Sequence, residues 1–550
     1  MRLTWRHYAA LAFVTFCLFL TGRMSLPPLD RDEPRYMEAS AQMLESGDFI
    51  DVRFLDQPRY LQPAGIYWLE AGAEALFGGP RDRHTAWPYR IPSLIGVTLA
   101  VTLTAWIGAS LFGGATGLLA GALLGVSTLM TAEGRMATID TVLLLDILLV
   151  EAALLSAFQD RQSHRPTPVR TALLYWIALG CGLMLKGPVV LIPAFGTPLA
   201  LLAVERQAGW WTRLRPAWGW LITVAIVLPW CVAIYVVSHG DFFHRAVGTN
   251  FLGKIGHGQQ AHGMAPGYYL GVFILSFWPG ALFTVLALPA IWLRRAEPGV
   301  RFLLCWIVPH WLVFEAIATK LPHYVLPTYP AIAILTAASL TRWTLLRPQA
   351  VWARALMAAY GVVWAALGLA FCLVGPALLW RFEHRLSPVA VIAAIGALPA
   401  LLFSIRLLLR GERLHAALAA IAAAVMIHAG LFLGVIPDLT VIQLAPRAAA
   451  LFDDYRPCED STLLSVSYSE PSLAFLAGSN TRFPTIPAAA DLLRDHGNCT
   501  LVLVDRRDEP ALGAALAARG RRLVEYGRVA GLNYSNGHML NLGLFAAAKP

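Results

Sequence analysis

Apolar runs of about 17 to 25 residues recur along this chain between residue 8 and about residue 435. A run of that length can cross the hydrocarbon core of a bilayer as one α-helix. Only 14% of the 550 residues are charged and 57% are hydrophobic, whereas an average soluble chain has about 25% charged residues. The sequence therefore predicts an all-α polytopic membrane bundle and excludes a string of ordinary soluble domains. About thirteen spans are expected, at residues 8–26, 91–111, 115–131, 138–158, 171–186, 188–204, 216–237, 267–293, 302–318, 324–340, 352–379, 388–405 and 414–435.

Positive charge is distributed unevenly between the loops that join these runs. One alternating set of loops holds 17 arginines and four acidic residues, namely Arg2, Arg6, Arg161, Arg165, Arg170, Arg206, Arg213, Arg215, Arg294, Arg295, Arg301, Arg342, Arg347, Arg354, Arg406, Arg410 and Arg413, with Asp160, Glu205, Glu297 and Glu412. Arginine-rich short loops stay in the cytoplasm. We therefore expect the other loops to face outward, into the periplasm. The net charge of +9 is an orientation signal and does not indicate nucleic-acid binding.

Three segments on the expected outer side are long enough to carry a function. Two of them are loops, at residues 27–90 and 238–266, within a transmembrane domain of residues 1–436. The third is the tail at 437–550, where the composition changes to that of a soluble domain.

The tail alternates short apolar runs with helical stretches, which predicts a periplasmic α/β domain. The expected strands are 463–466, 500–504 and 523–526, and the expected helices are 488–494 and 509–518. Cys458 and Cys499 are the two cysteines outside the expected spans. A periplasmic disulfide between them is expected, and two free thiols are the alternative.

The densest cluster of charged residues, Asp30 to Tyr36, directly follows the first apolar run. Pro34 suits the first turn of a helix, with Asp32 and Glu33 at its N-terminal end. We expect this helix to run from about residue 34 to residue 46 and to end near Gly47. The cluster is either a capped, solvated loop or a site in which Asp32 serves as a general base or an orienting carboxylate.

Seven motifs in chain order resemble one family. The stretch Asp32-Glu33-Pro34-Arg35-Tyr36, followed by residues 43–49, resembles the start of the lipid-carrier-dependent glycosyltransferases of the C superfamily (glycosyltransferase families 39 and 83). These include protein O-mannosyltransferases and the aminoarabinose transferases that modify lipid A, which are closest in pattern. The later matches are Pro63 with Tyr67-Trp68, Arg90-Ile91-Pro92-Ser93, Arg135-Met136 with Asp140, Leu185-Lys186-Gly187-Pro188, His262 and Pro266 with Tyr268-Tyr269 and Trp278-Pro279, and Lys320-Leu321-Pro322-His323-Tyr324 through Pro327. Ser469-Glu470-Pro471-Ser472 matches more weakly.

The resemblance implies the membrane fold of that superfamily and the transfer, with inversion, of a sugar from a polyprenyl phosphate carrier such as undecaprenyl phosphate. The acceptor would be lipid A or another cell-envelope glycan at the periplasmic face of a bacterial inner membrane. A protein O-mannosyltransferase-like enzyme and a lipid-linked sugar flippase or transporter are the alternatives. We expect a monomer whose partners are the donor, the acceptor and membrane lipids, without nucleic acid.

The resemblance also implies the site residues. Asp32 and Glu33 are the expected catalytic residues. A departing lipid phosphate develops charge, so fixed cations and hydrogen-bond donors should surround it. Those expected to bind substrate are Arg35, Tyr36, Tyr60, Gln62, Arg90, Arg135, Asp140, Lys186, Lys254, His262, Tyr269, Lys320, His323 and Tyr324. For Arg135 and Lys254, a cation that snorkels to the membrane interface is the alternative reading.

Two departures from the aminoarabinose transferase pattern concern a metal. Those enzymes read Glu-Lys-Pro where this chain has Leu61-Gln62-Pro63, and the histidine that accompanies that glutamate falls on Asn250 here. The histidines of the middle loop, His239, His244, His257 and His262, lack the spacing of a zinc site. No metal site and no cofactor are therefore predicted, and a divalent metal remains an open alternative that the ligand spacing does not support. The identities of the sugar and the acceptor also stay open.

Overall fold

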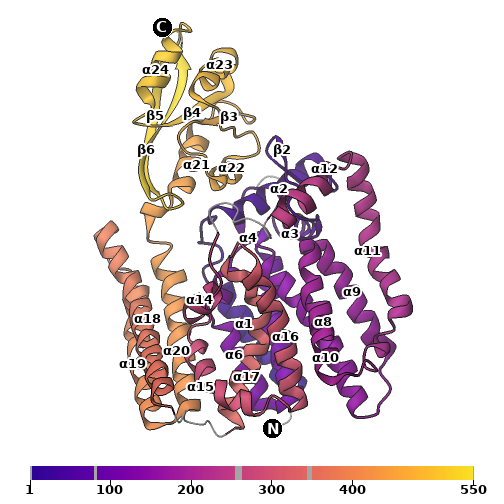
Figure 1. Ribbon diagram of the computed structural model, residues 1–550. Helices are drawn as coiled ribbons and strands as arrows, with labels where there is room; N and C mark the ends of the chain where they lie inside the picture. The colour runs from indigo at the N-terminus through magenta and orange to yellow at the C-terminus, as the bar shows by residue number, and fades with distance from the viewer. Residues whose placement is uncertain (1–2, 80–82, 254–262, 344–349, 549–550) are drawn as a thin grey trace.

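The computed structural model describes residues 3–79, 83–253, 263–343 and 350–548, which form a helical bundle that carries a small α/β domain at one end (Figure 1). Helices cover each of the expected apolar runs. The polytopic helical bundle and the C-terminal α/β domain are confirmed. The bundle helices are α1 (Trp5–Leu20), α5 (Ile91–Phe112), α6 (Gly114–Gly125), α7 (Thr128–Glu133), α8 (Asp140–Gln162), α9 (Val169–Lys186), α10 (Leu191–Glu205), α11 (Pro216–Val237), α14 (Tyr268–Ser276), α15 (Gly280–Leu293), α16 (Pro298–Ala316), α17 (Tyr329–Thr341), α18 (Val351–Glu383), α19 (Pro388–Arg410) and α20 (Arg413–Gly430).

Among the described residues, nine helical stretches are long and apolar enough to cross a membrane, and α1, α6 and α15 are shorter apolar helices. One of the nine, Val169–Glu205, contains both α9 and α10, joined by the 3-10 turn η1 (Gly187–Val190). The expected span at 267–293 is two helices, because Pro279 lacks the backbone N–H that would continue α14 into α15. The total of about thirteen crossings stays a prediction.

The C-terminal domain is built on a four-stranded sheet in the order β3-β4-β6-β5. Its strands are β3 (Thr462–Ser465), β4 (Thr500–Asp505), β5 (Arg522–Asn533) and β6 (His538–Ala548). β3 and β4 are parallel, and the β5–β6 hairpin joins β4 in antiparallel register. The sequence predicted the first three strands but not β6.

The central strand β4 is buried on both faces, as its continuous apolar sequence requires. Leu501 and Leu503 pack with residues of α21 (Leu444–Tyr455) and α22 (Pro471–Ala477). Val502 and Val504 pack on the opposite face with residues of α23 (Ile486–His496) and α24 (Glu509–Ala517). Cys458 and Cys499 are joined by a disulfide, with their Cα atoms 5.6 Å apart and a sequence separation of 41. The boundary at residue 436 stays a prediction.

The first outer loop contains the helix that the charged cluster predicted. It is α2 (Asp32–Ser46), and Gly47 ends it with φ of 72°, a left-handed conformation that favours glycine. The loop continues through the β1–β2 hairpin to α3 and α4. These elements are β1 (Arg53–Phe54), β2 (Gln57–Pro58), α3 (Gly65–Phe77) and α4 (Ala86–Tyr89).

A buried ion pair anchors the start of α2 to the bundle. The Arg90 Nε atom donates to Glu33 Oε1 over 2.7 Å, and both side chains are 0% exposed. The same carboxylate accepts the backbone N–H of Ala137 and of Leu29, each at 2.8 Å. Arg90 also donates to the Arg23 and Leu26 carbonyls. Both carboxylate oxygens of Glu33 are engaged within the protein. The structure therefore gives Glu33 and Arg90 an anchoring role, and the catalytic role of Glu33 and the substrate contact of Arg90 stay predictions.

The loop before α2 also holds the C-terminal domain. Ser472 donates its backbone N–H and its hydroxyl to the two carboxylate oxygens of Asp30, at 2.8 and 2.6 Å. Burial raises the pKa of the Asp30 carboxyl to about 6, although these hydrogen bonds favour its charged form. Arg31 pairs with Glu470 at 3.3 Å. The α/β domain is therefore docked directly on the segment that precedes Asp32.

We predict that Cys458→Ser, Cys499→Ser or reduction will lower the free energy of unfolding of the C-terminal domain by about 4 kcal/mol, as expected for a cross-link that closes a loop of this size. Hydrogen exchange of β3 and β4 in the full-length protein measures this effect. Cys17→Ser, at an exposed free cysteine of α1, is the control and should change nothing in the domain. Unchanged protection of both strands in the reduced protein would contradict the prediction.

We predict that Arg90→Met will destabilise the protein by about 3–5 kcal/mol, because it leaves the Glu33 carboxylate buried without its cation. Thermal unfolding in detergent micelles measures the loss. The control is Arg53→Met, which removes an arginine whose side chain is about half exposed and pairs with Asp51; it should cost at most about 1 kcal/mol. Equal Tm values for the two variants would show that the pair does not anchor α2.

Candidate functional site

A cavity of about 540 Å³ lies beneath the first outer loop, with its walls formed by that loop, α8, α9, α11, α16 and the 3-10 segment η4 (Pro322–Thr328). Its lining divides into charged and polar residues and a set of apolar residues. The polar residues include Asp32, Arg35, Tyr36, Arg59, Gln62, Glu133, Asp140, Lys186 and His323, and the apolar ones include Val227, Trp230, Phe242, Val247 and Phe314.

Asp32 is the exposed carboxylate of this cavity. It begins α2, where the helix dipole stabilises a negative charge. Its side chain is 67% exposed, and Arg35 Nη1 lies 3.9 Å from Oδ1. Unlike the neighbouring Glu33, it is free to contact a ligand in the cavity. The structure thus separates the two carboxylates that the sequence placed together.

The aromatic and amide residues of the outer loop form one wall. The Tyr36 hydroxyl donates to Gln62 Oε1 at 3.2 Å, and Arg59 Nε donates to the Tyr67 hydroxyl at 2.9 Å. The Arg59 guanidinium also lies over the Tyr36 ring, 5.2 Å from its centroid. Burial raises the pKa of the Tyr36 phenol well above its usual range, so it stays a neutral hydrogen-bond donor. Arg59 was not expected from the sequence. It adds a buried cation to the lining of the cavity.

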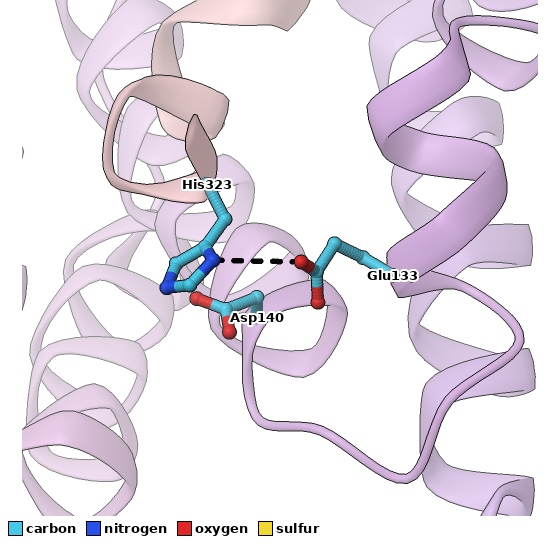
Figure 2. Close-up of side chains that lie close together, drawn as sticks. All are labelled: Glu133, Asp140 and His323. Atoms are coloured by element: carbon cyan, nitrogen blue, oxygen red, sulfur yellow. Dashed lines mark ion pairs between the residues drawn. The ribbon is translucent and has the colours of Figure 1, made fainter. Parts of the chain in front are cut away.

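A second group of polar residues lies deeper, at the ends of the bundle helices. Lys186, the last residue of α9, donates to Asp140 Oδ1 over 2.6 Å. His323 Nδ1 lies 3.5 Å from Glu133 Oε1. Figure 2 shows that Glu133, Asp140 and His323 point toward one another from three separate segments. Asp140, Lys186 and His323 were expected from the sequence, whereas Glu133 was not. The one signal for Glu133 is its place two residues before the Arg135-Met136 motif.

Two expected phosphate-binding cations are used inside the protein. Arg135 is fully buried, donates to the carbonyls of Leu18 and Thr131, and lies over the Phe19 ring. Lys320 is also buried and donates to carbonyls at the C-terminal end of α16, including those of Glu315 and Ile317. Both therefore satisfy helix ends that would otherwise leave carbonyl groups without donors.

The remaining expected residues divide into three groups. Tyr324 lines the cavity, and the Lys186 ammonium lies 5.8 Å from the centroid of its ring. The Tyr60 hydroxyl donates to Asp51 at 2.7 Å, so it is engaged with the protein itself. The Tyr269 ring is buried and packs beside Trp311. Lys254 and His262 lie outside the described residues.

The chemistry of this cavity suits an amphiphilic anion. Lys186, Arg35 and Arg59 provide positive charge, and Tyr36 and Tyr324 provide hydroxyl donors, as phosphate recognition requires. The apolar residues of α11 and α16 line the same cavity, where they can contact a hydrocarbon chain. Asp32 adds one exposed acceptor for a proton or a cationic group.

The sequence is similar to proteins that act on lipid-linked sugars. The family described as dolichyl-phosphate-mannose-protein mannosyltransferase matches residues 9–243. The undecaprenyl phosphate-alpha-4-amino-4-deoxy-L-arabinose arabinosyl transferase of Pectobacterium carotovorum is 29% identical over 59% of this chain and 56% of its own. The protein of the same name from Erwinia tasmaniensis is 28% identical over 71% of this chain and 76% of its own. The chain thus spans little more than half the length of the first of these relatives.

Solved structures share the architecture over nearly the whole chain. ArnT from Cupriavidus metallidurans bound to undecaprenyl phosphate superposes with a TM-score of 0.73 at 18% identity, covering 98% of this chain and 97% of that one. An oligosaccharyltransferase from Archaeoglobus fulgidus superposes with a TM-score of 0.51, covering 99% of this chain and 74% of that one. The chain therefore has the fold of the lipid-carrier-dependent glycosyltransferases of the C superfamily and is aminoarabinose transferase-like in sequence, as its motifs predicted.

Proposed function

We propose that this protein transfers a sugar of the 4-amino-4-deoxy-L-arabinose type from undecaprenyl phosphate to lipid A or another cell-envelope glycan. The observation that carries the proposal is the amphipathic cavity. Lys186 and the exposed Asp32 belong to its polar lining, and α11 and α16 supply apolar lining residues. The sequence similarity to arabinosyl transferases and the shared fold support the same donor class.

The transfer breaks the bond between the anomeric carbon and the phosphate oxygen of the donor and forms a bond from that carbon to an acceptor oxygen, with inversion. The electron pair of the broken bond goes to the lipid phosphate, whose growing charge Lys186 and Arg35 stabilise. If the acceptor is a hydroxyl, Asp32 takes its proton. If the acceptor is a phosphate that is already ionised, Asp32 instead orients the acceptor or a cationic sugar amine.

The site and the C-terminal domain are proposed to face the periplasm. In Figure 1 the N-terminus lies at the end of the bundle opposite the C-terminal domain. The arginine-rich segments begin with Arg2 and Arg6, near that N-terminus, and such segments stay in the cytoplasm. A bacterial inner membrane, a polyprenyl-phosphate donor and a monomeric enzyme remain part of the proposal.

A protein O-mannosyltransferase-like activity is the second candidate, because the mannosyltransferase family matches residues 9–243. Mass spectrometry of lipid A, surface glycans and envelope proteins from cells with and without the protein separates the two. An added pentosamine on lipid A or a glycan supports the proposal, and added hexose on protein supports the alternative. Translocation of a lipid-linked sugar without transfer would indicate a flippase and contradict both.

We predict that Asp32→Asn will lower the rate of transfer by about 10²–10⁴-fold, the usual contribution of a positioned proton acceptor, while the protein stays folded. The measurement is single-turnover transfer by purified protein in nanodiscs. Asp56→Asn, an exposed carboxylate of the same outer loop, is the control and should retain full activity. Wild-type rates in Asp32→Asn would remove Asp32 from the mechanism.

We predict that Lys186→Met will raise the donor KM by at least about tenfold, because a hydrogen bond to a charged group contributes about 1.5–3 kcal/mol. Lys320→Met removes a lysine that donates to carbonyls of α16, so it should lower the Tm and leave the donor KM of the folded fraction near the wild-type value. A raised donor KM in Lys320→Met, with a normal value in Lys186→Met, would reverse the assignment of the two lysines.

A further inference from the structure

Glu133, Asp140 and His323 form a compact cluster in the cavity wall. They come from the end of α7, the start of α8 and the segment η4. One potential ligand atom from each lies within 4.8 Å of the other two (Figure 2). All three residues line the cavity, so a ligand that enters the cavity can reach them.

The charges of this cluster do not suit the phosphate that Lys186 is proposed to bind. Glu133 and Asp140 are two carboxylates and Lys186 is one ammonium, so these three groups together carry one net negative charge. An anion placed beside Lys186 would be repelled by both carboxylates at short range. A divalent cation would change the sign of this charge and leave one net positive charge to attract the phosphate.

The side chains are also the right chemical types for such a cation. One imidazole nitrogen and two carboxylate oxygens are a ligand set used for zinc, and manganese accepts the same oxygens. Three protein ligands leave a coordination position open for a water or a phosphate oxygen. Metal–ligand bonds of about 2.0–2.2 Å need the widest pair of ligand atoms to approach by roughly 1 Å, which small side-chain rotations provide.

Neighbouring groups orient both carboxylates for this purpose. The Thr138 hydroxyl donates to Glu133 Oε2 at 3.0 Å, and that leaves Oε1 directed at His323. Lys186 donates to Asp140 Oδ1, and the second oxygen of Asp140 remains available. Such outer hydrogen bonds are typical of metal ligands, because they fix the orientation of the coordinating atom.

We propose that Glu133, Asp140 and His323 bind a divalent transition-metal cation of the zinc or manganese class, which holds the donor phosphate beside Lys186. Binding of the cation stands on the cluster alone, whereas its contact with phosphate rests on the proposed function.

The test is metal binding by the purified, full-length protein after removal of bound metal. Zn²⁺ and Mn²⁺ are titrated separately by calorimetry, and bound metal is counted by elemental mass spectrometry after desalting. We expect one equivalent of one of these ions, and an affinity at least about tenfold lower in both His323→Gln and Glu133→Gln. Each substitution closely retains the size of the side chain. Two variants are used so that the test still stands if one of them lowers the Tm.

His415 and Glu412 supply a matched control. They form a His–carboxylate pair of similar length, 3.4 Å, but are exposed, and no third ligand joins them among the described residues. His415→Gln and Glu412→Gln should therefore bind metal as the wild type does. Metal that binds equally to the wild type and to folded His323→Gln lies elsewhere, for example at the histidines of the middle loop, and would overturn the proposal, as would the absence of binding at micromolar metal.

Transfer assays on the same samples separate this proposal from the proposed function. Metal bound at His323 without any transfer to lipid A or glycan would support the site and contradict the function. Transfer that proceeds at full rate in metal-free protein and in His323→Gln would support the function and overturn the metal-dependent contact with phosphate. A donor KM that falls on adding the metal to the wild type, but not to His323→Gln, is the result we expect.

Discussion

The buried pair between Arg90 and Glu33 fixes the geometry on which the cavity depends. A buried ion pair is stable only when its remaining hydrogen-bonding groups are also satisfied, and this carboxylate also accepts the N–H groups of Leu29 and Ala137. One side chain therefore joins the loop before α2 to the segment between α7 and α8. Asp32 is adjacent to Glu33, and Asp140 follows Ala137 by three residues, so the pair sets the relative positions of two opposite walls.

Three neighbouring acidic residues of the first outer loop make different contacts because the chain turns between them. Asp30 lies before α2 and binds Ser472 of the C-terminal domain. Asp32 and Glu33 are consecutive residues at the start of a helix, so their side chains point about 100° apart. The Asp32 side chain is exposed, whereas the Glu33 side chain is fully buried in its ion pair with Arg90. Asp30, which holds the C-terminal domain, lies two positions before Asp32, so the docking of that domain bears directly on the position of Asp32.

The sequence predicted the parts of this protein that follow from local chemistry. Pro34 and Gly47 marked the two ends of α2, whereas the orientation that the arginine-rich loops indicate stays a prediction. β6 was not predicted, although Leu540, Leu542 and Leu544 alternate with Asn541 and Gly543 in the pattern of a strand. The sequence also does not show where the side chains of Arg135 and Lys320 point. A cation near the end of a helix can donate to backbone carbonyls or turn outward to a ligand. Glu133 belongs to none of the sequence motifs. Its place in the cluster follows only from the fold, in which η4 places His323 beside it.

These directions change how much positive charge the proposed phosphate site contains. The motifs offered six cations near the outer interface, but Arg90, Arg135 and Lys320 are bound to carboxylate or carbonyl groups of the protein itself. In the described part of the cavity, Arg59 partly replaces them from the outer loop, while Lys186 remains the cation nearest Asp140. Lys186 also pairs with that carboxylate, so the same ammonium must serve both Asp140 and the phosphate. The strength of phosphate binding in the proposed reaction is therefore set by whatever balances Asp140 and Glu133, rather than by the number of basic residues in the motifs.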